Sequence, residues 1–138
     1  MKKLKEILLI DDEEADNYYH QRVIRRLGCA ERVVVKTNGQ LGLDYLTTKT
    51  ADGYPQPDIV FLDINMPVMN GWEFLRAYAK LAPEQRAHVV LVMLTTSLSE
   101  EDRSAAQAVA TDFHSKPLKK EALLAILATH FPGLIESS

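Results

Sequence analysis

Five short strand-like segments that alternate with helix-like patterns constrain the fold of this chain more than any other feature. The segments span residues 6–10, 32–36, 59–62, 89–94 and 111–115. Their apolar runs are typical of strands that helices cover on both faces. Because a parallel strand must be reached through a crossover connection, this alternation predicts an α/β fold with one parallel five-stranded sheet and helices on both of its faces.

Length and composition narrow the class of protein. The chain has 138 residues, enough for one domain with a sizeable core. A net charge of −3 argues against direct binding to nucleic acid, and no apolar run is long enough to span a membrane. The apolar segment after the basic N-terminus is too short for a signal peptide. Cys29 is the only cysteine, so we expect no internal disulfide and a cytoplasmic location.

The first helical pattern follows the segment 6–10. It has Ala15, Tyr19, Val23 and Leu27 on one stripe and ends at Gly28. This spacing predicts an amphipathic helix that packs through the stripe.

Polar residues gather where the predicted strands end. Asp11 and Asp12 follow the first strand, Asp63 the third, Thr95 the fourth and Lys116 the fifth. All carboxyl ends of a parallel sheet lie along one edge, and ligands of open α/β sheets bind there. Each residue alone has a structural explanation, such as capping a backbone amide, but the set as a whole favours a functional site.

The residue types at this edge favour phosphoryl transfer. Three neighbouring carboxylates repel one another, so either one becomes protonated or a divalent cation binds. Oxygen ligands without histidine or cysteine favour Mg²⁺ over zinc. With Mg²⁺ and Lys116 neutralising charge and Thr95 donating a hydrogen bond, Asp63 is the candidate nucleophile, and its product is an aspartyl phosphate.

These motifs, in this order, resemble the receiver domain of two-component response regulators, the CheY-like family. They are Asp-Asp after the first strand, Leu-Asp-Ile-Asn-Met-Pro-Val-Met-Asn-Gly around Asp63, Leu-Thr after the fourth strand and Lys-Pro after the fifth. The resemblance covers residues 5–131 and leaves 132–138 as a short C-terminal tail, so we expect no effector domain. It implies a flavodoxin-like (βα)5 three-layer sandwich with strand order 2-1-3-4-5.

The resemblance also implies a role for each site residue. Asp63 would accept a phosphoryl group from a histidine kinase or a histidine phosphotransfer protein. Asp12, Asp63 and the backbone carbonyl of Asn65 would ligate Mg²⁺, with Asp11 acting mainly through water.

Two switch residues and a cis peptide bond complete the implied site. Thr95 and Lys116 would be drawn toward the phosphoryl group, and Phe113 takes the position of the family's switch aromatic. The Lys116–Pro117 bond is expected to be cis. Thr96 is bulkier than the small residue often found after the switch threonine, so it is expected to restrict access to Asp63.

The leading hypothesis is therefore a stand-alone receiver that binds a downstream target protein and is not an enzyme in its own right. One alternative is a phosphatase of the haloacid dehalogenase type with Asp63 as nucleophile. That family has a second aspartate two residues later, where this chain has Asn65. Another alternative is a receiver-like module that binds without phosphate. The alanine-rich residues 104–110 and the last strand would serve a homodimer as well as a target.

Overall fold

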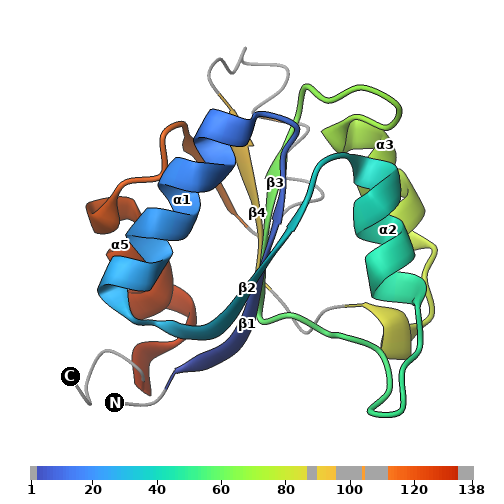
Figure 1. Ribbon diagram of the computed structural model, residues 1–138, viewed down its shortest axis with the longest axis horizontal. Coiled ribbons are helices and arrows are strands. Elements are labelled where there is room, and N and C mark those ends of the chain that lie inside the picture. The colour runs from blue at the N-terminus through green and yellow to red at the C-terminus, as the bar shows by residue number, and fades with distance from the viewer. Residues whose placement is uncertain (1–2, 87–89, 96–103, 105–111, 134–138) are drawn as a thin grey trace.

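The computed structural model describes residues 3–86, 90–95, 104 and 112–133. Its five strands form one parallel sheet in the order β2-β1-β3-β4-β5, which confirms the predicted topology (Figure 1). Each strand lies within two residues of the segment predicted for it. The strands are β1 (Leu4–Ile10), β2 (Ala30–Lys36), β3 (Ile59–Asp63), β4 (Val90–Thr95) and β5 (Asp112–Ser115).

Helices cover both faces of the sheet and create two apolar cores. Figure 1 shows α1 (Glu14–Leu27) and α5 (Lys120–His130) on one side, and α2 (Gly39–Thr47) and α3 (Gly71–Ala79) on the other. Successive residues of β1 point to opposite faces. Leu9 therefore packs in the core with residues of α1 and α5, while Leu8 packs in the core with residues of α2 and α3.

One more helical segment lies in the described part of the chain. A short 3-10 helix, η1 (Pro83–Gln85), follows α3. Apart from Ser104, the alanine-rich residues 104–110 lie outside the described residues, as do Thr96 and residues 134–138.

The packed face of α1 differs from the predicted stripe. Tyr19 is 41% exposed, and the buried residues of the helix are Asn17, His20 and Ile24. The prediction was correct for Val23 and Leu27, which pack against the core, but it left out two buried polar residues that each have a backbone partner. Asn17 Nδ2 donates to the Asp11 carbonyl at 2.8 Å, and His20 Nε2 accepts from the Leu118 N–H at 3.1 Å. A buried polar group with such a partner loses little by leaving water, although the Oδ1 atom of Asn17 has no hydrogen-bond partner among the described residues.

The loop after β3 is fixed by close packing against the start of α3. The Gly71 N–H donates to the Ile64 carbonyl at 2.8 Å. A side-chain carbon at Gly71 would lie 2.6 Å from the Asp63 carbonyl oxygen, so a larger residue would push this loop away. Asn70 and Glu73 form a capping box that fixes the first turn of α3. The backbone that carries Asp63 is thereby held in one position.

Candidate functional site

Three of the predicted acidic residues meet at the carboxyl edge of the sheet. Oxygen atoms of Asp11, Asp12 and Asp63 lie within 4.8 Å of one another. Asp11 is 4% exposed and Asp63 is 5% exposed, whereas Asp12 lies nearer the surface. Because β1 and β3 are adjacent parallel strands, their ends bring these carboxylates together. Such an oxygen-rich cluster fits a hard divalent cation such as Mg²⁺.

Lys116 reaches this cluster from the end of β5. Its Nζ atom lies 2.8 Å from Asp11 Oδ2 and 3.3 Å from Asp63 Oδ1, and its side chain is only 6% exposed. The structure therefore brings together the lysine and the carboxylates that the sequence pattern placed at one edge. The Lys116–Pro117 peptide bond is cis, as the resemblance implied.

Asp16 is a further member of the site that the sequence analysis missed. Its Oδ2 atom accepts a hydrogen bond from Lys116 Nζ at 2.8 Å. Asp16 lies in the first turn of α1, where an acidic residue is explained equally well by the helix dipole. Its partner is 100 positions away in the sequence, so no local spacing could have revealed the contact.

The charges at the edge alter one another's protonation. Burial, followed by repulsion from Asp11, raises the pKa of the Asp63 carboxyl to about 6, against the attraction of Lys116. Burial by itself lowers the pKa of Lys116, but hydrogen bonds to Asp11 and Asp16 outweigh it and hold the pKa above its ordinary value. Lys116 is therefore held in its charged form, and Asp63 binds its proton more tightly than an ordinary aspartate does.

A buried histidine holds the segment that carries Lys116. His20 is 2% exposed, and its Nε2 atom accepts a hydrogen bond from the Leu118 N–H at 3.1 Å. Burial lowers the pKa of His20, although Asp11 and Asp16 oppose the shift. A neutral imidazole is required for this acceptor role. Helix α1 therefore contacts the segment 116–118 twice, through Asp16 and through His20.

The remaining predicted site residues lie on the same edge or close to it. Asn65 is exposed in the loop after β3. Thr95 ends β4, one residue beyond Leu94, which pairs with Asp63 in the strand register. The position of its side chain is outside the described part of the structure. Phe113 is partly buried in β5 and packs against the core on the side of α2 and α3.

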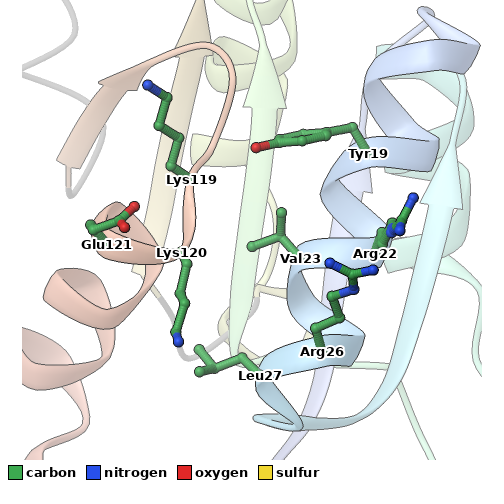
Figure 2. A pocket seen from close by; sticks show the side chains of 8 residues that line it. All are labelled: Tyr19, Arg22, Val23, Arg26, Leu27, Lys119, Lys120 and Glu121. Carbon is green, nitrogen blue, oxygen red and sulfur yellow. The ribbon is translucent and has the colours of Figure 1, made fainter.

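A second feature, a basic groove, opens beside the site between α1 and the start of α5 (Figure 2). Its volume is about 540 Å³. Figure 2 shows the Tyr19 ring extending from α1 over the groove, with Val23 beneath it. The residues that line the groove are Tyr19, Arg22, Val23, Arg26, Leu27, Lys119, Lys120 and Glu121. None of its four cations forms an ion pair with another residue in the described part of the chain.

Comparison with known proteins identifies the family. Residues 7–128 match the model of the response regulator receiver domain. A sheet of this topology with an acidic carboxyl edge and a buried lysine defines a class of CheY-like proteins. The chain belongs to the response regulator receiver family. The resemblance inferred from the motifs is therefore confirmed.

Individual relatives agree with this assignment. The chain is 35% identical to a probable methanogenesis regulatory protein, FilR2, of Methanothrix harundinacea, over 85% of this chain and 75% of that protein. It is 31% identical to the two-component response regulator 24 of Arabidopsis thaliana, over 87% and 79% of the two chains. A two-component response regulator of Cytophaga hutchinsonii has a similar structure, with a TM-score of 0.82, 27% identity and coverage of 98% and 99%.

Some relatives are much longer proteins. The chain is 33% identical to a protein-glutamate methylesterase/protein-glutamine glutaminase of Desulfotalea psychrophila but covers only 31% of it. The activity in that name belongs to that protein. Among the described helices of this chain, none combines the length and the apolar character needed to cross a membrane.

Proposed function

We propose that this chain acts as a receiver in a two-component phosphorelay. Asp63 accepts a phosphoryl group from a histidine kinase or a histidine phosphotransfer protein in the cytoplasm. The observation that carries this proposal is the contact of Lys116 Nζ with Asp63 Oδ1, at 3.3 Å, in a site shared with two further carboxylates. A nucleophile beside a fixed cation suits phosphoryl transfer, in which catalysis is mostly positioning and charge stabilisation.

The chemical step is an in-line displacement. An oxygen of the ionised Asp63 carboxylate attacks phosphorus, the bond from phosphorus to the donor histidine nitrogen breaks, and the imidazole keeps the electron pair. With its pKa at about 6, Asp63 is mostly ionised at neutral pH and remains a competent nucleophile. Lys116 neutralises an oxygen of the transferred group, and the hydroxyl of Thr95 donates a hydrogen bond to another.

Four residues would hold a metal ion in this mechanism. They are Asp12 and Asp63 through carboxylate oxygens, Asn65 through its backbone carbonyl, and Asp11 mainly through water. When bound, Mg²⁺ supplies positive charge that offsets the repulsion between these carboxylates and the incoming phosphoryl group.

The output of phosphorylation is binding to a target protein rather than turnover of a substrate. Movement of Lys116 and Thr95 toward the phosphoryl group shifts β5, the strand that carries Phe113. Two residues separate Phe113 from Lys116, so a change at the site reaches the surface of β5 and α5 through a short segment of backbone. A homodimer formed through this surface is an alternative readout of the same switch.

The basic groove is suited to a protein phosphodonor. Lys119 lines the groove and is separated from Lys116 by two residues, so a donor bound there lies beside the phosphorylation site. The cations Arg22, Arg26, Lys119 and Lys120 are exposed and outnumber the single acid Glu121. This charge favours a donor with an acidic contact surface.

Intact mass after incubation with Mg²⁺ and a small acyl phosphate tests the proposed chemistry. We expect one phosphoryl group on the wild-type chain, none on Asp63→Asn, and none when the metal is chelated before the reaction. Sustained turnover of a phosphomonoester would instead indicate a haloacid dehalogenase-type phosphatase. Mg²⁺ binding without any adduct would indicate a module that works independently of phosphate.

A further inference from the structure

Lys116 is shared unequally among three carboxylates. Its Nζ atom lies 2.8 Å from Asp11 and from Asp16, but 3.3 Å from the proposed phosphoacceptor Asp63. An ammonium group has three N–H donors, and the two shorter contacts use two of them. The lysine is thus held most closely by residues that do not receive the phosphoryl group.

The two shorter contacts differ in how readily they can be released. The Asp11 side chain is 6% exposed, and a buried carboxylate that loses its cation is strongly disfavoured. The Asp16 side chain is 37% exposed, so water can replace the lysine around it at small cost. Of these two contacts, the one with Asp16 is therefore the exchangeable one.

We propose that Asp16 is a positioning residue that holds Lys116 on the α1 side of the site and competes with the phosphoryl group for it. This inference rests on the proposed function of Asp63 as phosphoacceptor. Phosphorylation adds negative charge at Asp63, which draws the ammonium toward that residue and away from Asp16. Asp16 thereby lowers the stability of the phosphorylated state, because forming that state gives up the contact with Lys116.

The backbone near Lys116 does not depend on Asp16. His20, one turn further along α1, holds the Leu118 N–H at 3.1 Å. Residues four apart on a helix lie on the same face, so Asp16 and His20 hold the side chain and the backbone of one segment separately. Loss of the Asp16 charge is therefore expected to free the ammonium without displacing the segment.

The test compares Asp16→Asn with Asp52→Asn, in which the same charge is removed from an exposed loop residue outside the site. The probe is beryllofluoride with Mg²⁺, which mimics a phosphoryl group on an aspartate. We expect Asp16→Asn to bind the probe about two- to fivefold more tightly, because a partly exposed ion pair no longer competes. The comparison is made at saturating Mg²⁺, and Asp16→Glu should restore the wild-type affinity for the probe.

A merely structural role for Asp16 would lower thermal stability without tightening probe binding. Equal or weaker binding of beryllofluoride by Asp16→Asn at saturating Mg²⁺ would overturn the proposal. The ¹⁵N resonance of the Lys116 ammonium group, recorded without any probe, gives an independent test of the contact. It should shift in Asp16→Asn and not in Asp52→Asn, and the absence of that shift also overturns the proposal.

Failure of the proposal for Asp16 can be distinguished from failure of the proposed function of Asp63. If the wild-type chain itself takes up neither beryllofluoride nor a phosphoryl group, the proposed function fails. The ammonium resonance still decides whether Asp16 holds Lys116.

Discussion

The acidic edge of the sheet and the basic groove beside it use charge in opposite ways. At the edge, Asp11, Asp63 and Lys116 are buried and lie within ion-pairing distance. In the groove, the cations are exposed and make no ion pair with other described residues. Buried charges interact strongly and are screened little by salt, whereas exposed charges act weakly at contact but attract partners from a distance. The edge is thus suited to phosphoryl transfer, and the groove is suited to attracting a charged partner protein.

The two regions share structural elements, which makes the contrast testable. Helix α1 contributes Asp16 to the edge and Arg22 to the groove, and the segment after β5 contributes Lys116 to the edge and Lys119 to the groove. Substitutions a few residues apart should therefore have very different consequences.

The largest effect is expected for Lys116→Met. This change leaves Asp11 and Asp63 buried without their cation, and removing one partner of a buried ion pair costs about 3 kcal/mol or more. Chemical denaturation should show that loss in the free energy of unfolding, and Mg²⁺ should recover part of it. Lys119→Met removes the same charge at an exposed position and should change stability by less than about 0.5 kcal/mol. Equal losses of unfolding free energy in Lys116→Met and Lys119→Met would contradict the proposed difference between the edge and the groove.

A smaller effect is expected for Asp63→Asn in the absence of divalent metal. The folded chain raises the pKa of Asp63 from 3.8 to about 6, so folding favours the protonated form. The stabilisation that the protonated Asp63 carboxyl gives to the folded state is fully present below pH 3.8 and is lost as the pH rises through about 6. At pH 8 the ionised carboxylate therefore destabilises the wild type, and Asp63→Asn should be more stable by about 2–3 kcal/mol.

The pH dependence is the control for this prediction. The advantage of Asp63→Asn should shrink as the pH falls and disappear near pH 4, where Asp63 of the wild type is protonated in the folded state. Saturating Mg²⁺ at pH 8 should also reduce it, because metal binding stabilises the folded wild type. An advantage that stays constant from pH 4 to pH 8 would show that burial and Asp11 do not disturb the titration of Asp63.

The sequence predicted the buried edge better than it predicted the packing of α1. Strands that end in Asp11, Asp63 and Lys116 have strong local signals, and the topology of a parallel sheet brings their ends together. The strand order came from the family resemblance. The structure agrees with both.

Two of the missed features, the roles of His20 and Asp16, depend on contacts between distant parts of the chain. His20 is buried with the Leu118 N–H as its partner, 98 positions away, whereas the Asp11 carbonyl that pairs with Asn17 Nδ2 is only six positions away. A helical stripe chosen by hydrophobicity alone therefore selected Tyr19, which instead lines the groove. Asp16 was missed for the same reason, since its role appears only once the segment after β5 lies beside α1.

The smallest effect is expected in the groove, from Arg26→Gln combined with Lys120→Gln. Both side chains are exposed, so the double variant should keep wild-type stability and should react with a small acyl phosphate at the wild-type rate. Transfer from a phosphorylated histidine kinase or phosphotransfer protein should slow by about tenfold at low salt, because long-range attraction is lost. The deficit should shrink near physiological ionic strength, where the Debye length is about 8 Å. Equal slowing with both donors would place the groove cations in the chemistry of Asp63 and would end the separation between the two regions.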